Sequence, residues 1–282
     1  LNDGFGALSC ALAPHCQVTS SGDSFLGALA LQKNLARNDL PADSVTFVPA
    51  SATAEGPFDW VLIRVPKTLA LLEDLRLACE LQDLPFDGVV KESAPSQYEI
   101  NMHHVDNPVL AAKQIIMMKR LIKGVAGKHG LIASFMPKPF TEHPGSGMHT
   151  HVSLFKGEEN AFFDPTAELN LSKVGRSFIA GLLKHAPEIT LITNQWVNSY
   201  KRLHGGGEAP AVANWGPSAR GSLVRVPMYK PKKENSTRIE FRSPDSSCNP
   251  YLAYAVMLAA GLKGVEEGYV LAPADSTDVR PL

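Results

Sequence analysis

The sequence predicts an α+β fold in which helices pack on the outside of a curved, mainly antiparallel sheet. Strand-like segments alternate irregularly with longer helical ones, which is the order expected of a sheet covered by helices. No repeat with a period of roughly 20 to 50 residues is present, which argues against a solenoid. Hydrophobic residues make up 44% and charged residues 20% of the 282 positions, as in ordinary globular domains.

The composition excludes several classes of protein. A chain of 282 residues fits one large domain or two ordinary domains of about 150 residues each. The formal net charge of −1 gives no reason to expect a nucleic acid or an anionic membrane as a partner. No apolar run reaches the roughly 18 residues of a membrane span. The 4 cysteines lack CxxC spacing and no signal peptide is recognised, so we expect a cytoplasmic protein with reduced thiols.

The first part of the chain gives weak signals. Residues 1–57 contain small and polar residues with scattered prolines, and one helix is expected there, around Phe25–Arg37. After this part the pattern is clearer. Apolar residues at helical spacing predict a helix over Leu69–Leu81. Val89–Lys91 and Gln97–Asn101 have the character of two strands around a connection that contains a proline.

Two asparagine–proline pairs predict the starts of long helices. Asn107-Pro108 would open a helix through Lys128, and Asn249-Pro250 a last helix to about Gly268, because asparagine caps a helix and proline fits its first position. Two further helices are expected over residues 172–184 and 187–196. Four more segments are strand candidates: Leu131–Phe135, His149–Phe155, Ser222–Val226 and Arg238–Arg242.

Two glutamates suggest one side of a divalent metal site. Glu92 and Glu99 flank a loop between two short strands, so their carboxylates can converge on one point. Two carboxylates held close together repel each other unless a hard divalent ion or a shared proton compensates them. Two unrelated glutamates on the surface of a hairpin would explain the same spacing.

Two histidines suggest the other side of that site. His149 and His151 lie two residues apart in a predicted strand, so both side chains point to the same face. Gly145 and Gly147 precede them and allow a ligand to approach the backbone. Imidazole is a better ligand for Mn²⁺ than for Mg²⁺. A half-buried pair of histidines with satisfied hydrogen bonds is the structural alternative.

Arginines are concentrated in the last third of the chain. Guanidinium groups bind carboxylate and phosphate oxygens in a two-pronged manner, which predicts anionic substrates beside the metal. Glu240 lies between two of these arginines in one predicted strand, and a purely structural ladder of salt bridges would have the same pattern. The arginines are Arg202, Arg220, Arg225, Arg238 and Arg242.

A glycine-rich segment predicts a mobile flap. His204–Pro210 contains three consecutive glycines followed by Glu208, so the flap would carry an acid over a reactive intermediate. An ordinary flexible loop is the alternative. The segment is not a nucleotide-binding loop of the G-x-G-x-x-G type, because no strand-turn-helix surrounds it.

Seven segments, in the same order, resemble the catalytic domain of glutamine synthetase. More narrowly, they are similar to actinobacterial paralogues, some of which resemble γ-glutamylpolyamine synthetases. The resemblance extends from about Phe58 to Gly268 and implies the glutamine synthetase/guanido kinase-like catalytic fold. The segments are K-E-S-A-P-S-Q-Y-E-I, F-M-P-K-P-F, G-S-G-M-H-T-H-V-S-L, N-S-Y-K-R-L, G-G-E-A-P, R-V-P-M-Y-K-P and R-I-E-F-R-S-P-D-S-S-C-N-P-Y-L.

The resemblance implies an ATP-dependent ligase with a role in nitrogen metabolism. Glutamate and ATP would form γ-glutamyl phosphate, which ammonia or a small amine then attacks, with two Mg²⁺ or Mn²⁺ ions at the site. The implied metal ligands are Glu92, Glu99, His149 and Glu240. The implied substrate-binding residues are Arg202, Arg242 and Gly145, and the nucleotide-binding residues are His151, Ser153, Lys233 and Arg238. The implied catalytic residues are Glu208, Arg220 and Arg225.

The sequence departs from the family pattern in its first part. The family's first catalytic strand carries E-x-E, one acid for each metal, whereas the counterpart here has Ser44 and Thr46, so each ion is expected to lack one ligand. Residues 1–57 are expected to be a divergent start of the catalytic domain and residues 58–282 its main part. The family's β-grasp domain has no expected counterpart, which weakens the expectation of its homo-oligomeric rings. A non-catalytic binding or structural relative is therefore the alternative.

Overall fold

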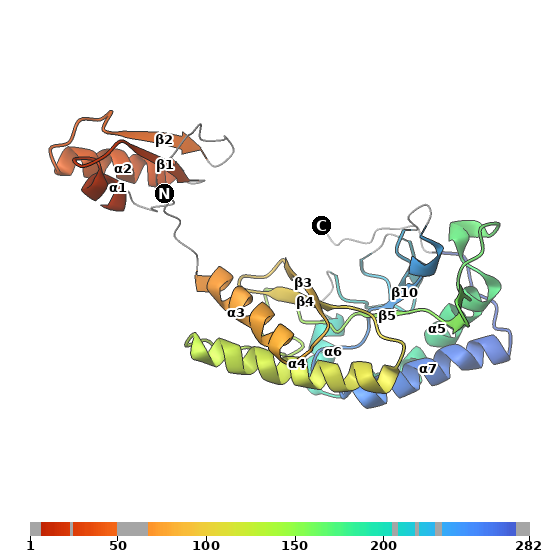
Figure 1. The fold of residues 1–282 in the computed structure, drawn as a ribbon. Helices are drawn as coiled ribbons and strands as arrows, with labels where there is room; N and C mark the ends of the chain where they lie inside the picture. The colour runs from red at the N-terminus through yellow and green to blue at the C-terminus, as the bar shows by residue number, and fades with distance from the viewer. Residues whose placement is uncertain are drawn as a thin grey trace. The chain divides into compact units, whose positions relative to one another are not determined.

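The computed structural model describes residues 7–22, 25–49, 67–204, 208–217, 220–228 and 233–274. The chain divides into two compact units, residues 1–71 and 72–282. Figure 1 shows the mixture of helices and strands that the α+β class predicts. The boundary expected at residues 57 and 58 lies outside the described residues. None of the helices that can be described combines the length and apolar character needed to cross a membrane.

The first unit contains a parallel pair of strands joined by a helix. α1 (Ala7–Leu12) is followed by β1 (Val18–Gly22), α2 (Phe25–Arg37) and β2 (Val45–Pro49). β1 and β2 pair in parallel, and parallel neighbours need a crossover such as α2 between them. The predicted helix at α2 is confirmed, whereas β1 was not predicted. Thr46 lies in β2, whose described pairing is with β1 in this unit.

The main sheet of the second unit has four strands in the order β5-β10-β9-β8. The pairs β5–β10 and β10–β9 are antiparallel and the pair β9–β8 is parallel, so the expected mainly antiparallel sheet is confirmed. Its strands are β5 (Thr150–Val152), β8 (Trp215–Gly216), β9 (Val224–Arg225) and β10 (Ile239–Phe241). Two antiparallel hairpins accompany it: β3 (Phe86–Lys91) with β4 (Tyr98–Met102), and β6 (Phe155–Lys156) with β7 (Glu159–Asn160).

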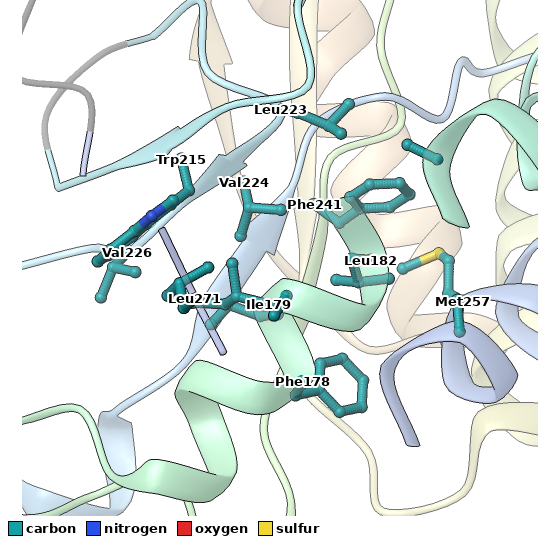
Figure 2. Packing of buried hydrophobic residues seen from close by; sticks show 14 of the residues in the cluster. Phe178, Ile179, Leu182, Trp215, Leu223, Val224, Val226, Phe241, Met257 and Leu271 are labelled. Carbon is teal, nitrogen blue, oxygen red and sulfur yellow. The ribbon is translucent and has the colours of Figure 1, made fainter. Parts of the chain in front are cut away.

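Two helices, α5 (Lys173–Thr193) and α7 (Pro250–Glu266), bury one face of the main sheet (Figure 2). They approach each other closely because glycines face the partner backbone. A Cβ atom on Gly181 would lie 2.2 Å from the carbonyl oxygen of Ala260. The apolar core includes Phe178, Ile179, Leu182, Trp215, Leu223, Val224, Val226, Ile239, Phe241, Met257 and Leu271.

Capping asparagines start two of the helices as predicted. The side-chain oxygen of Asn107 accepts hydrogen bonds from two backbone N–H groups at the start of α4 (Pro108–Lys128). Asn249 caps α7 in the same way. These bonds satisfy N–H groups that the first turn of a helix leaves without partners. The remaining helical elements are α3 (Lys67–Leu81), α6 (Val197–His204), and the short 3₁₀ turns η1 (Glu168–Asn170) and η2 (Glu234–Ser236).

Three sequence-based expectations about secondary structure were wrong. Leu131–Phe135 forms no strand. The helices expected over 172–184 and 187–196 are one helix, α5, with Pro187 inside it. Proline removes one backbone hydrogen bond, but the residues on both sides of it bury apolar side chains against α7 and the sheet. The strand expected over His149–Phe155 divides into β5 and β6.

Candidate active site

The second face of the main sheet carries a row of charged side chains. Glu240 in β10 pairs with His151 in β5 and with Arg225 in β9. Directly opposed residues of neighbouring strands point to the same face. The alternation along R-I-E-F-R therefore turns Glu240 away from the core while Ile239 and Phe241 are buried in it. One register thus brings three predicted site residues together.

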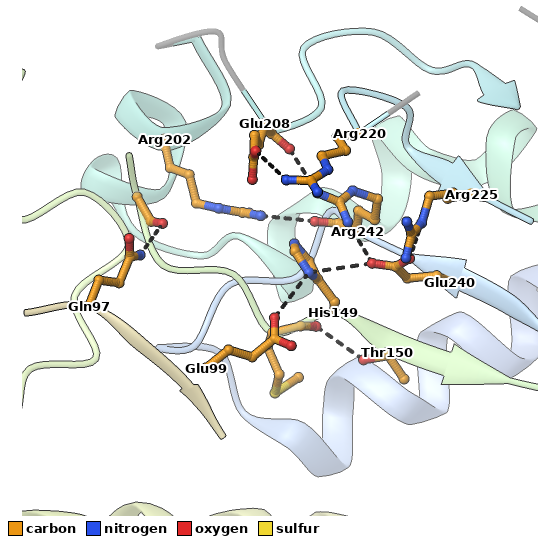
Figure 3. Close-up of polar contacts among 12 residues, drawn as sticks. Gln97, Glu99, His149, Thr150, Arg202, Glu208, Arg220, Arg225, Glu240 and Arg242 are labelled. Carbon is orange, nitrogen blue, oxygen red and sulfur yellow. Dashed lines mark hydrogen bonds and ion pairs between the residues drawn. The ribbon is translucent and has the colours of Figure 1, made fainter. Parts of the chain in front are cut away.

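Glu240 is the centre of this row (Figure 3). Its Oε2 atom accepts a hydrogen bond from Arg225 Nε at 2.5 Å, and its Oε1 atom accepts one from Arg242 Nη1 at 2.5 Å. Only 3% of its side chain is exposed. Burial acts to raise the pKa of Glu240, but the charges of Arg242 and Arg225 outweigh it, so the pKa is lowered. Glu240 is therefore a buried carboxylate that stays ionised.

His149 joins this centre to the hairpin β3–β4. Its Nδ1 atom lies 3.4 Å from Glu240 Oε1 and 4.0 Å from Glu99 Oε2. Burial lowers the pKa of His149 to about 3, and the charge of Arg242 acts in the same direction. The imidazole is consequently neutral at neutral pH. Burial, followed by the charge of Glu92, raises the pKa of Glu99.

The described residues have donor chemistry suited to a divalent ion but do not complete a metal site. No group of three or more His, Cys, Asp or Glu side chains in the described ranges is arranged to hold an ion. Both carboxylate oxygens of Glu240 accept hydrogen bonds from arginines. The charge of Glu240 is therefore compensated by arginines, and the described residues do not by themselves complete a site for Mg²⁺ or Mn²⁺.

Arg202 lies beside Arg242. It extends from α6 and is 3% exposed, and its Nη1 and Nη2 atoms donate to the carbonyl oxygens of Ser243 at 2.7 Å and Arg242 at 2.9 Å. A Cβ atom on Gly147 would lie 2.7 Å from Arg202 Nη2, so the glycine makes room for the guanidinium. Gly145 packs on the same side chain. Burial lowers the pKa of Arg202 to about 10, which leaves it cationic at neutral pH.

A buried amide network that the sequence did not predict fixes the loop after β10. Asn194 Nδ2 donates to the carbonyl oxygen of Ser243 at 2.8 Å and to Asp245 Oδ2 at 3.2 Å. Asn194 Oδ1 accepts hydrogen bonds from Ser243 Oγ and Thr193 Oγ1. Asn194 and Asp245 are fully buried. Asp245 is part of the R-S-P-D-S-S segment, whereas nothing around Asn194 in the sequence marks a site.

Arg242 connects the centre to the segment expected to form a flap. It is 4% exposed, and its Nη2 atom donates to the carbonyl oxygen of Glu208 at 3.1 Å. Its Nε atom has no hydrogen-bond partner among the described residues. The Glu208 carboxylate accepts a bond from Arg220 Nη1 at 2.9 Å, and both side chains are exposed. The glycines of the expected flap, residues 205–207, lie outside the described residues.

Only some of the residues expected to bind the nucleotide contact one another. Arg238 Nε donates to His151 Nδ1 at 3.0 Å, which requires the ring proton of a neutral His151 to be on Nε2. Ser153 follows β5 and has no hydrogen bond with a described residue. Lys233 is exposed at the start of η2, and no described contact ties its side chain to the row of Glu240. Gly145 accepts a hydrogen bond on its carbonyl from Gln97 Nε2 at 2.9 Å.

Comparisons with known proteins identify the family of this chain. Residues 42–281 match the family model of the glutamine synthetase catalytic domain. The chain is 58% identical over 202 residues to glutamine synthetase of Mycobacterium tuberculosis, covering 72% of this chain and 45% of that protein. It is 58% identical over 188 residues to glutamine synthetase of Mycolicibacterium smegmatis, covering 67% and 42%.

The chain also covers a similar share of more distant relatives. Glutamine synthetase of Thermotoga maritima is 44% identical over 218 residues, covering 77% of this chain and 48% of that protein. The solved structure of apo GmaS without ligand superimposes with a TM-score of 0.67 at 33% identity, covering 75% of this chain and 48% of that one. The chain thus spans less than half the length of the relatives that it matches. From its sequence motifs, its site and these matches, the chain belongs to the glutamine synthetase catalytic-domain family.

Proposed function

We propose that this chain carries the catalytic-domain part of an ATP-dependent ligase that forms an amide at the γ-carboxylate of glutamate. Ammonia or a small amine would be the acceptor. The observation that supports this best is the row of arginines around one ionised, buried carboxylate, Glu240, with the neutral imidazole of His149 beside it. Such a row offers fixed positive charge to phosphate and carboxylate oxygens in a site that does not need to reorganise.

The proposed reaction has two steps. A γ-carboxylate oxygen of glutamate attacks the γ-phosphorus of ATP, the bond to the β,γ-bridging oxygen breaks, and ADP leaves. The amine nitrogen then attacks the acyl carbon, the carbon–oxygen bond to the phosphoryl group breaks, inorganic phosphate leaves, and the nitrogen gives up a proton. Phosphoryl transfer is accelerated mainly by positioning and by cationic groups around the transferred oxygens. Arg220 and Arg225 are the proposed cations.

Arg202 and Arg242 are the proposed glutamate-binding residues. Arg202 is held by two backbone carbonyls and keeps its charge, so it is oriented before a substrate arrives. Arg242 has a buried Nε–H without a described partner, which a carboxylate oxygen would satisfy. Glu208 is the proposed proton acceptor for the attacking amine, and its ion pair with Arg220 places it beside a proposed phosphate-binding cation.

The ATP site and its metals are proposed as well. His151, Ser153, Arg238 and Lys233 are the proposed nucleotide contacts, and Glu92, Glu99, His149 and Glu240 the proposed metal ligands. Divalent ions bound there would neutralise phosphate charge. Because the described donors do not complete a metal site, the steps above are assigned to the chain's own residues.

A second candidate is a relative that binds its ligands without turnover. The incomplete donor set favours it, because both oxygens of Glu240 are already engaged by Arg225 and Arg242. This candidate predicts binding of nucleotide or glutamate without release of phosphate. The amine acceptor is a separate choice between ammonia and larger amines.

Phosphate release in the presence of ATP, glutamate, ammonium and Mn²⁺ tests the ligase. We expect release that requires both ATP and glutamate and that falls about 100-fold in Glu240→Gln, the usual effect of removing one preorganised charged group. Glu158→Gln, which changes an exposed glutamate, is the matched control and should retain activity. Nucleotide binding without release under any metal would reject the ligase in favour of the second candidate. Putrescine in place of ammonium then identifies the acceptor.

A further inference from the structure

A cavity of about 540 Å³ lies outside the candidate active site. It opens between α4, the segment Phe135–Pro137, the start of α6 and the pair Ser246–Ser247. None of the residues proposed for the ligase reaction lines it. Its volume is within the range of roughly 300 to 1,000 Å³ typical of small-molecule sites.

Two lysines give this cavity a positive charge. Lys119 and Lys123 lie one turn apart on α4, and their Nζ atoms are 5.6 and 5.7 Å from the centre of the Phe135 ring. Neither forms a salt bridge with any residue in the described ranges. Like charges at this helical spacing repel each other. Burial lowers the pKa of Lys119, while Cys248 and Asp245 oppose this shift and Lys123 reinforces it.

Asp245, whose charge acts on Lys119, is already engaged in hydrogen bonds. Asp245 is fully buried, and its two carboxylate oxygens accept hydrogen bonds from Asn194 and Ser247. The hydroxyl of Ser246 donates to the carbonyl oxygen of Phe135. Both serine protons are therefore used, so charge recognition in the cavity depends on the ammonium groups. The start of α6, whose first residues line the cavity, adds the positive end of a helix dipole.

The other walls of the cavity are apolar and uncovered. Trp196 is 56% exposed, Val197 79% and Met136 46%, and all three line it. An aromatic ring beside two ammonium groups suits a ligand with a flat apolar body and an anionic group at one end. A simple inorganic ion would leave these apolar walls in water.

We propose that this cavity is a binding site for a small organic anion, with its carboxylate or phosphate group at Lys119 and Lys123 and its apolar body against Trp196 and Met136. The site is distinct from the row of Glu240. The proposal does not depend on the ligase reaction.

Titration of the full chain with phenyl phosphate tests this site. We expect saturable binding by calorimetry and a change in fluorescence that disappears in Trp196→Phe. The double variant Lys119→Gln/Lys123→Gln should weaken binding at least about 10-fold, because it removes both charge-assisted contacts. Lys113→Gln/Lys128→Gln removes the same charge from exposed positions of the same helix and should bind like the wild type. Circular dichroism of each variant checks that the fold is retained.

Three results would overturn the proposal. If both double variants weaken binding equally, phenyl phosphate responds only to the net charge of the protein. If inorganic phosphate binds as tightly as phenyl phosphate, the apolar walls do not contribute to binding. Absence of saturable binding, or binding that is unchanged in a folded Lys119→Gln/Lys123→Gln variant, would show that the cavity does not recognise an organic anion.

Discussion

The two faces of the main sheet differ completely although they come from the same strands. One face buries Ile239, Phe241 and Val224 beneath α5 and α7, and the other carries Glu240 and Arg225 in an ion-paired row. In β10 the two sets alternate residue by residue. A shift of register by one residue would exchange them. The alternation that builds the core therefore also places the charges of the candidate site.

The largest expected effect is on the apolar face. Phe241→Ala removes a fully buried ring at the centre of the core and should lower the free energy of unfolding by about 3–5 kcal/mol. Urea unfolding followed by circular dichroism measures this. Leu191→Ala, at an exposed position of α5, is the control and should change the free energy by less than about 0.5 kcal/mol. Similar losses in the two variants would contradict the described packing.

A smaller loss is expected on the charged face. Glu240→Gln keeps the shape of the side chain but leaves the buried guanidinium of Arg242 without its counter-charge. Removing one partner of a buried ion pair costs about 3–5 kcal/mol, and this loss should lie near about 3 kcal/mol because the amide oxygen can still accept one hydrogen bond. Arg225→Gln should cost less, because Arg225 is more exposed than Arg242. If Glu240→Gln unfolds at the wild-type urea concentration, the row contributes nothing to stability and the contrast between the faces is lost.

The smallest effect, over the range from pH 8 to pH 10, concerns the loop that leads from the charged face to α7. Burial, and then the charge of Asp245, raises the pKa of Cys248 to about 12. The folded state therefore holds this proton more tightly, and the resulting stability is complete below about pH 9 and is lost as the pH rises toward 12. The slope should be at most about 1.4 kcal/mol per pH unit.

Unfolding free energies measured between pH 8 and pH 10 test this slope. Cys248→Ala should flatten the decline, whereas Cys16→Ala, at an exposed cysteine, should leave it unchanged. A wild-type decline that persists in Cys248→Ala would assign the alkaline loss to another group. The result would show whether the thiol of Cys248 is shielded from water, as the side chains on the apolar face of the sheet are.

The sequence predicted much of the second unit because its signals are local. The cap at Asn107 and the proline after it define the start of α4 without help from the rest of the chain. The same holds for Asn249 and α7. Local signals failed where tertiary packing decided the outcome. Pro187 indicated a break, but the apolar residues around it keep α5 continuous against the core.

The candidate site shows the same division. Motifs predicted His149, Glu240 and the arginines, because their residue types and order are specific to the family. They could not show that Arg225 and Arg242 share the two oxygens of Glu240, since this depends on the pairing of β9 with β10. They also gave no sign of the role of Asn194. A buried amide with all its hydrogen bonds satisfied is recognisable only from its neighbours in space.

By itself, the sequence determined the family, the α+β class and the residue types at the site, because spacing and capping act over a few residues of one segment. The tertiary structure alone decided three features: the charge compensation at Glu240, the orientation of Arg202 by two backbone carbonyls, and the cavity beside Lys119. Each of them joins segments that lie far apart in the chain. Strand register and helix packing, which set such contacts, are properties of the whole fold.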